Sequence, residues 1–183
     1  VVWVADYYNH NVVRLQGQQV DKRLTGFSYP YRLSVYQADG SVWVSDYSHG
    51  QVVKLKGDGS VELVRVGGFN GPYGLSVNQA DGSVWVADYY NHQVVKLSPQ
   101  GTELARVSGF YYPTSVAVNQ NDGSVWVADQ SNNRVVKLSS NGALLARVYG
   151  FNYPFWVSVD QRDGSVWVAD RYNNRVVKLA PDT

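Results

Sequence analysis

The residue types best suited to chemistry stand together in residues 84–95, which read VWVADYYNHQVV. Its acid, Asp88, and its base, His92, lie four residues apart and could form a site for general acid–base catalysis. The equivalent segments of the chain argue otherwise, because they carry His10, Gly50, Asn133 and Asn174 in place of His92. Gly, Asn and, less readily, His tolerate a left-handed backbone, whereas a catalytic imidazole would not exchange with glycine. We therefore expect a turn residue with positive φ at His92, and we interpret His49 in the same way.

Five aspartates at the ends of apolar segments could be imagined as a ring of metal ligands: Asp6, Asp46, Asp88, Asp129 and Asp170. Calcium, however, needs several oxygen ligands within one segment or converging on one point, which separate turns do not supply. An aspartate at a strand end can instead accept backbone N–H bonds or pair with Arg134 or Arg175, five residues on. We expect no metal, no cofactor and no catalytic residue in this chain. Asp-Gly pairs at Asp39, Asp81, Asp122 and Asp163 predict hairpin turns.

These positions recur because the chain repeats one unit. The tetrad VWVA or VWVS followed by Asp occurs five times at spacings of 40 to 42 residues, centred on Trp3, Trp43, Trp85, Trp126 and Trp167. Each unit contains four short apolar segments, rich in Val and bounded by Gly, Asn, Asp or Pro, which predict four strands, A to D. In the third unit these strands fall at 73–77, 83–87, 93–97 and 103–107.

Four short antiparallel strands in a unit of roughly 40 residues are typical of a propeller blade. We predict an all-β chain that forms a β-propeller of four-stranded antiparallel blades, as a single domain over residues 1–183. Its units start near residues 1, 39, 81, 122 and 163, which gives 18 strands in about five blades, the first and last partial. We expect an incomplete ring, since a five-bladed one would lack a D and A pair and a six-bladed parent would need further blades.

The units also resemble the NHL repeat: GF, then Pro, a short V-x-V strand, DGSVWVAD, and NHQVVKL or NNRVVKL. The resemblance covers nearly the whole chain. It implies a propeller, commonly of six blades, that serves mostly as a platform for proteins, RNA or small ligands, with a few enzymatic relatives such as amidating lyases. Fold alone does not give function, so the site residues must be argued separately.

Strand B is apolar on both faces, so neighbouring blades must cover it on both sides. We hypothesise that the Trp of one blade fills space left by a small residue in strand A of its neighbour, at Ser34, Ser76, Ala117 or Ser158. Repeated cations in strands C and D are spread over every blade, which favours a solvated rim over a nucleic-acid track. They are Lys54, Lys96, Lys137, Lys178, Arg65, Arg106 and Arg147.

Composition limits the partners. The net charge of +1 offers no field that would attract nucleic acid or an anionic membrane. Apolar runs are far shorter than the roughly 20 residues that cross a bilayer, and the absence of cysteine excludes disulfides and thiol catalysis. We expect no nucleic-acid partner, no membrane insertion, and an extracellular or cell-surface location, with the cytoplasm as the alternative.

The tyrosines are unevenly placed. Because successive strands are antiparallel, the B-to-C and D-to-A connections emerge at one end of the ring. Twelve of the 14 tyrosines fall in or beside these connections: Tyr7, Tyr8, Tyr29, Tyr31, Tyr47, Tyr73, Tyr89, Tyr90, Tyr111, Tyr112, Tyr153 and Tyr172. An aromatic loop face opposite a polar one is typical of a binding surface. Units differ most just after the repeated proline, where strand A opens beside the axis and where specificity would lie.

The candidate binding residues are Tyr8, Tyr31, Arg32, Tyr73, Tyr90, Tyr112, Tyr153, Phe155, Trp156, Arg171 and Tyr172. We expect a non-enzymatic scaffold that engages a protein, peptide or glycan through this face. One alternative is a structural repeat protein that self-associates into oligomers or fibres through its loop face or its open blade edges. Ranked lower is a propeller enzyme of the lyase or hydrolase type whose site residues lie outside this chain.

Overall fold

The computed structural model describes residues 1–181, and these form strands and short 3-10 helices. Their 18 strands make five antiparallel sheets, called here blades 1 to 5. Blade 1 contains β1 (Val2–Asp6), β2 (Asn11–Gln16) and β3 (Gln19–Leu24). Blade 2 contains β4 (Pro30–Val35), β5 (Val42–Asp46), β6 (Gln51–Leu55) and β7 (Glu62–Val66). Blade 3 contains β8 (Pro72–Val77), β9 (Val84–Asp88), β10 (Gln93–Leu97) and β11 (Glu103–Ser108).

Blade 4 contains β12 (Pro113–Val118), β13 (Val125–Asp129), β14 (Arg134–Leu138) and β15 (Leu144–Val148). Blade 5 contains β16 (Pro154–Val159), β17 (Val166–Asp170) and β18 (Arg175–Leu179). Four 3-10 helices occupy B-to-C turns: η1 (Tyr7–Asn9), η2 (Tyr89–Asn91), η3 (Gln130–Asn132) and η4 (Arg171–Asn173). The predicted all-β propeller with partial first and last blades is confirmed.

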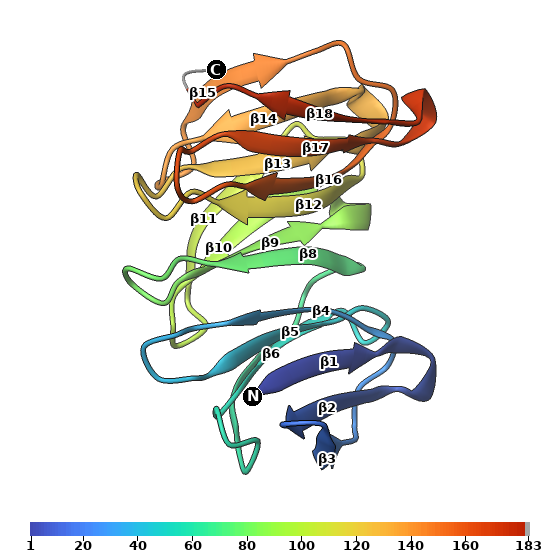
Figure 1. Cartoon of the computed structure of the whole chain (residues 1–183), viewed down its shortest axis with the longest axis vertical. Coiled ribbons are helices and arrows are strands. Elements are labelled where there is room, and N and C mark those ends of the chain that lie inside the picture. The colour runs from blue at the N-terminus through green and yellow to red at the C-terminus, as the bar shows by residue number, and fades with distance from the viewer. Residues whose placement is uncertain (182–183) are drawn as a thin grey trace.

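The blades follow one another in chain order. Figure 1 shows blade 1 at one end of the long axis and blades 4 and 5, which overlap in this view, at the other end. Strands β4, β8, β12 and β16 are spatial neighbours in that order, so the first strand of each of these blades lines a common axis. Within the described residues, no helix is long and apolar enough to cross a membrane.

The hydrophobic core lies between blades. Trp85 and Val94 of blade 3 form one cluster with Val116 and Val118 of blade 4. The same arrangement joins the other adjacent blades, and Trp43, Trp85 and Trp126 are at most 1% exposed as a result. Blade stacking is therefore what buries both apolar faces of strand B.

The small residue of strand A does not lie where we hypothesised. Ser34 pairs with Trp43 across the β4–β5 ladder of the same blade, so this small side chain lies beside the indole rather than under it. Strand A of the neighbouring blade contributes large aliphatic side chains instead, since Leu75 and Val77 share a cluster with Trp43. Ser34 also forms a hydrogen bond to the next blade, because its Oγ accepts the backbone N–H of Val77 at 3.1 Å.

The strand-C lysines do not belong to a solvated rim, and that prediction is wrong for them in blades 2 and 3. Lys54 and Lys96 are 6% and 8% exposed. Lys96 Nζ lies 5.9 Å from the centroid of the Trp85 ring and donates to the carbonyl oxygen of Ser140 in the next blade at 2.8 Å. The lysine covers the indole and ties two blades together. The strand-D arginine Arg106 is exposed and pairs with a glutamate of its own strand, as a rim residue would.

Candidate binding face and axial cavity

The B-to-C turns use His92 and its equivalents as structural residues. The predicted positive φ is confirmed at His10 (57°), Gly50 (62°), His92 (58°), Asn133 (53°) and Asn174 (50°). His92 Nδ1 accepts the backbone N–H of Tyr112 at 3.1 Å, and Asn133 Oδ1 accepts that of Tyr153 at 2.8 Å. His and Asn interchange here because each provides one acceptor on a left-handed residue. Because Nδ1 accepts, the neutral imidazole of His92 carries its proton on Nε2.

The strand-B aspartates hold the loops of the same end. Asp129 is fully buried, and its Oδ1 accepts the backbone N–H of Tyr111 at 2.7 Å while its Oδ2 accepts Arg134 Nε at 2.6 Å. Equivalent backbone bonds run from Ser28, Asn70 and Asn152 to Asp46, Asp88 and Asp170. The predicted backbone and arginine partners are confirmed. In residues 1–181, no cluster of three or more His, Cys, Asp or Glu could hold a metal ion.

His49 is different from the other two histidines. In the sister turns an asparagine donates to the strand-end aspartate, and His49 replaces it, with Nδ1 2.9 Å from Asp46 Oδ2. A carboxylate only accepts, so His49 Nδ1 carries the proton and Nε2 keeps a free lone pair. The half-exposed ring lines a cavity of about 310 Å³ together with Tyr47 and Tyr90. Interpreting His49 as a bare turn residue overlooked this pair, which the sequence signals by a histidine aligned with Asn9, Asn91, Asn132 and Asn173.

The aromatic face is a connected network of rings. Tyr31 and Tyr73, from adjacent first strands, have ring centroids 3.8 Å apart. Tyr73 also lies 5.4 Å from Tyr89 and 5.9 Å from Phe155, so it joins rings from blades 2, 3 and 5. The network continues through Tyr7, Tyr8, Tyr29, Tyr47, Tyr90, Tyr111 and Tyr112.

The remaining candidate residues lie at the edges of this network. Tyr153 and Tyr172 of blade 5 are stacked at 4.5 Å. The Arg171 guanidinium lies 5.3 Å from the centroid of Phe155 and so links this pair to the network. Tyr8, Tyr90 and Tyr172 present the most open rings of the candidate set, at 84%, 47% and 56% exposure.

Burial keeps the inner hydroxyls of the face protonated. It raises the pKa of Tyr89 to about 12, and it also raises the pKa of Tyr73 and Tyr47. A hydrogen bond from the Tyr47 hydroxyl to that of Tyr90, at 3.3 Å, adds to the effect of burial on the pKa of Tyr47. At neutral pH this part of the face therefore presents uncharged hydroxyl groups to a ligand.

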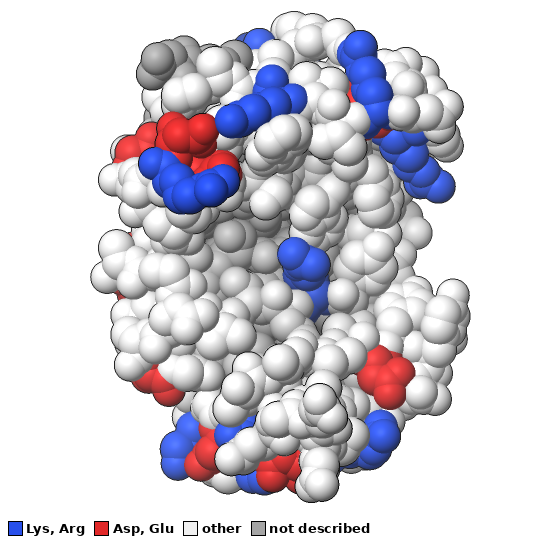
Figure 2. Space-filling view, viewed as in Figure 1, with Lys and Arg blue, Asp and Glu red and all other residues white. Residues whose placement is uncertain are grey.

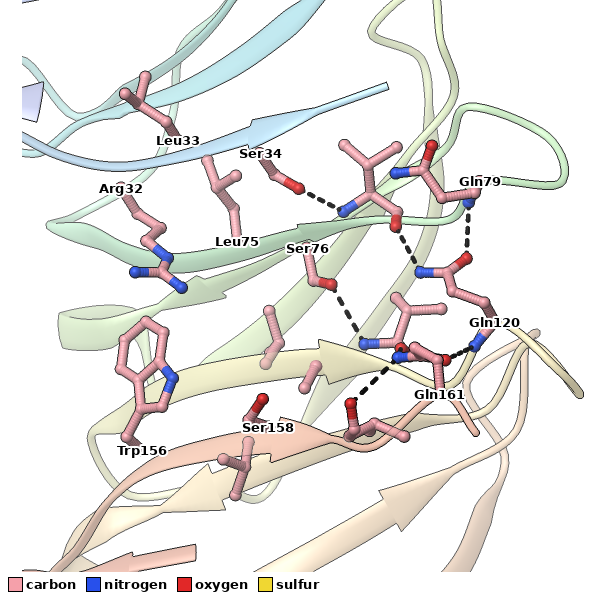
Figure 3. A pocket seen from close by; sticks show the side chains of 16 residues that line it. Arg32, Leu33, Ser34, Leu75, Ser76, Gln79, Gln120, Trp156, Ser158 and Gln161 are labelled. Atoms are coloured by element: carbon pink, nitrogen blue, oxygen red, sulfur yellow. Dashed lines mark hydrogen bonds between the residues drawn. The ribbon is translucent and has the colours of Figure 1, made fainter. Parts of the chain in front are cut away.

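An axial cavity of about 200 Å³ runs between the first strands of blades 2 to 5. Figure 2 shows the hollow in the middle of this side of the molecule, and Figure 3 shows the side chains that line it. Arg32 of blade 2 and Trp156 of blade 5 face each other across one end, with Arg32 Cζ 4.2 Å from the indole centroid. This is a cation–π contact between two blades that are not adjacent.

Glutamines line the other end of the cavity. The Gln79 backbone N–H donates to Gln120 Oε1 at 2.7 Å, and that of Gln120 donates to Gln161 Oε1 at 2.7 Å (Figure 3). Gln120 Nε2 donates back to the carbonyl of Val77 at 2.9 Å. On the sequence these segments belong to the polar face opposite the aromatic one. The missed signal is the recurrence of one residue, as Gln37, Gln79, Gln120 and Gln161, at the same place in four units.

Comparisons with known proteins found matches for the repeated unit and for the fold. Residues 69–97, 110–138 and 151–179 match the NHL repeat, and no curated protein matches the chain. The structure is similar to virginiamycin B lyase from Staphylococcus aureus, with a TM-score of 0.78 at 12% identity over 97% of this chain and 65% of that one. A streptogramin B lyase structure gives 0.77 at 16% identity, over 99% and 65%. A chain in a nidogen–laminin complex gives 0.68 at 17% identity, over 94% and 72%.

The chain thus spans about 65% of the length of the two lyases, and at these identities the likeness shows the fold alone. It nevertheless overturns one expectation. The inference that a chain of this fold is not an enzyme is wrong, because solved structures that share the fold include lyases. The three tandem repeat matches and the row of antiparallel blades show that the chain belongs to the NHL-repeat β-propeller family.

Proposed function

We propose that this chain binds a protein or peptide partner through its aromatic face. The observation that carries the proposal is the connected network of partly exposed rings from several blades, centred on Tyr73 beside the axial cavity. Tyrosine offers a large, rigid contact area at a small cost in side-chain entropy, and its hydroxyl can still form hydrogen bonds. A face of this kind suits a partner that buries a broad surface.

The ring geometry favours a polypeptide over a glycan. A sugar stacks on an open ring face, but here neighbouring rings cover one another, some stacked, as Tyr153 is on Tyr172, and some edge to face. Tyr89 and Tyr90 are at 83° to each other, and Tyr90 and Tyr112 at 90°. Each of these contacts covers the face of one ring with the edge of another, which leaves little flat surface for a sugar and still suits apolar side chains and backbone groups of a partner. The solved nidogen–laminin complex, which shares the fold, supports protein binding as a use of such a propeller.

The test replaces the exposed rings Tyr8, Tyr90 and Tyr172 with serine. The control replaces Gln18, Gln100 and Arg162 with serine, which are exposed residues in C-to-D and A-to-B turns at the opposite end. Partners isolated with the unmodified chain are identified, purified and titrated against both variants, and all three proteins are applied to a glycan array. We expect the tyrosine variant to lose at least about tenfold in affinity for the protein partner while the control keeps it. Unchanged affinity, or glycan binding that disappears with the tyrosines, contradicts the proposal.

Acid–base chemistry at His49 is a second candidate function, favoured by its pairing with Asp46. A buried carboxylate that holds Nδ1–H fixes the tautomer in which Nε2 can take a proton from a substrate or from water. Asp46 is fully buried, and the His49 side chain is 48% exposed. Tyr90, which lines the same cavity, could orient a bound molecule.

His49→Asn tests this function, because asparagine restores what the sister turns contain and should preserve the fold. We expect the unmodified chain to hydrolyse an activated ester such as p-nitrophenyl acetate faster than H49N. His92→Asn is the control, since the Nδ1 of His92 is already occupied by a backbone N–H. Equal rates in all three proteins remove His49 as a candidate base.

A further inference from the structure

The mouth of the axial cavity is asymmetric at one position of strand A. The second residue after the repeated proline is Arg32 in β4, Gly74 in β8, Ser115 in β12 and Trp156 in β16. The two residues between Arg32 and Trp156 in this order, Gly74 and Ser115, are small. They leave enough space for the Arg32 side chain to reach Trp156 (Figure 3). Figure 2 shows basic atoms in the middle of the hollow, surrounded by uncharged ones.

Arg32 has no counter-ion in the part of the chain that the structure describes. Of the 16 residues that line the cavity, Arg32 is the charged one. Seven other arginines are paired with carboxylates, as Arg65 is with Glu62 at 2.6 Å and Arg134 with Asp129 at 2.6 Å. Arg147 and Arg171 have no ion pair among the described residues, but they do not line the cavity. Burial lowers the pKa of Arg32, and Tyr31 only partly opposes this effect. The Arg32 side chain is nevertheless exposed at the cavity mouth, so an anion from outside the chain can reach it.

The surroundings of the guanidinium determine which anion fits. The Arg32 guanidinium lies over the Trp156 ring, and no described residue accepts a hydrogen bond from it, so its N–H donors stay available. One planar fork matches one planar carboxylate through two parallel hydrogen bonds. Phosphate-binding sites usually collect several cations, whereas the rest of this lining is neutral.

We propose that Arg32, clamped on Trp156, binds a carboxylate of the partner at the mouth of the axial cavity. The inference rests on the proposed function and deepens it: the partner of the aromatic face contributes an acidic side chain or a C-terminus. Tyr31, Tyr73 and Phe155 surround the point of entry, so the carboxylate is carried on a peptide whose neighbouring groups pack on these rings. The cavity of about 200 Å³ admits one side chain and excludes a folded element.

Small probes test the site without knowledge of the partner. Benzoate, its neutral amide benzamide, and phenylphosphonate are titrated into the ¹⁵N-labelled full chain, with the Trp156 indole N–H signal assigned by W156F. We expect benzoate to shift this signal saturably, benzamide not to shift it, and phenylphosphonate to bind no tighter than benzoate. Arg32→Gln should weaken benzoate at least about tenfold, because a charge-assisted bidentate pair is lost.

Arg162→Gln is the matched control, since Arg162 is an exposed arginine in an A-to-B turn, and it should leave the titration unchanged. Thermal unfolding of R32Q shows whether the variant is folded, and R32K, which keeps the charge without the fork, should bind benzoate less tightly than the unmodified chain. Equal binding of benzoate and benzamide, an unaffected R32Q, or tighter binding of phenylphosphonate overturns the carboxylate assignment. The serine variant of Tyr8, Tyr90 and Tyr172 tests the aromatic face separately, because those rings do not line this cavity.

Discussion

At the scale of single residues, a left-handed backbone explains why His, Asn and Gly share a turn position, and one side-chain acceptor atom explains why His and Asn interchange there. His92→Asn should preserve stability within about 0.5 kcal/mol, because asparagine keeps both the left-handed backbone and the acceptor for Tyr112 N–H. His92→Ala should cost about 1–2 kcal/mol, because it leaves that N–H unpaired and strains a residue at φ 58°. Urea unfolding measures both. If the two variants are equally stable, the imidazole is not acting as an acceptor.

Asp170 predicts how stability depends on pH. Burial alone would raise its pKa, but bonds from the Asn152 backbone and from the Asn173 and Arg175 side chains outweigh burial and lower it. A carboxyl whose pKa is lower in the folded state stabilises the fold above its unfolded pKa, near 4, and this contribution is lost as pH falls through the folded value. The free energy of unfolding should therefore decline below about pH 4, and more gently in D170N. Urea titrations from pH 7 to pH 2.5 measure the two slopes, and parallel curves would contradict this origin.

Comparison of the five aligned units was enough to predict the left-handed turn at His92 and the backbone and arginine partners of Asp170, but not the acceptor role of His92 Nδ1. The same comparison failed at His49, which stands alone and therefore looked like a neutral exception. In blade 2 a histidine replaces the asparagine of the sister turns, which preserves the bond to Asp46 and adds a second ring nitrogen, Nε2. Nothing in the sequence pattern alone gives the ring tautomer, because that depends on which partner lies at each nitrogen.

At the scale of elements, strand type and order were predictable, because period-two Val patterns and Gly or Asp turns are local signals. Contacts between neighbouring blades were not. The packing of Trp43 against Leu75 and Val77, the burial of Lys96 and the chain of glutamines all depend on how one blade is set against the next. These contacts join residues about one unit apart, and a pattern within one strand carries no information about them.

Gly74 sets the distance between strands β8 and β12. A Cβ on this residue would lie 2.7 Å from the carbonyl oxygen of Thr114 and 2.8 Å from the Cα of Ser115, both of which are backbone atoms that cannot turn away. Gly74→Ala should therefore lower stability by about 1–3 kcal/mol, since the two blades must move apart. Gly67→Ala is the matched control, because its Cβ would meet nothing within 4 Å, and it should be neutral or slightly stabilising. A neutral G74A in thermal unfolding would show that the blades are more loosely packed than this contact implies.

At the scale of the whole molecule, blades 1 and 5 each expose one apolar face that is buried against a neighbouring blade elsewhere in the chain. Val176 is 66% exposed in blade 5, whereas its equivalent Val94 is completely buried in blade 3. At the other end Val2 is 54% exposed, whereas its equivalent Val84 is completely buried. Trp167, at 44% exposure, lies on the open face of blade 5 in the place that Trp85 fills under blade 4. The open face of blade 5 is therefore the kind of surface that, between adjacent blades inside the chain, packs against a surface like the open face of blade 1.

Complementary faces at opposite ends should associate head to tail, since burial of apolar surface stabilises the contact and repeats a packing already used between every pair of neighbouring blades. We expect residues 1–183 to form dimers or longer assemblies as concentration rises in sedimentation velocity. Val176→Lys should weaken association at least about tenfold, because it would bury an unpaired charge, while leaving thermal unfolding of the monomer nearly unchanged. Val61→Lys is the control, since Val61 is similarly exposed, at 54%, but lies just before the outer strand β7. Two outcomes would contradict this prediction: a chain that stays monomeric over the whole concentration range, or a V176K variant that assembles as readily as V61K. Either outcome would show that the inter-blade surfaces pack only when they belong to one chain.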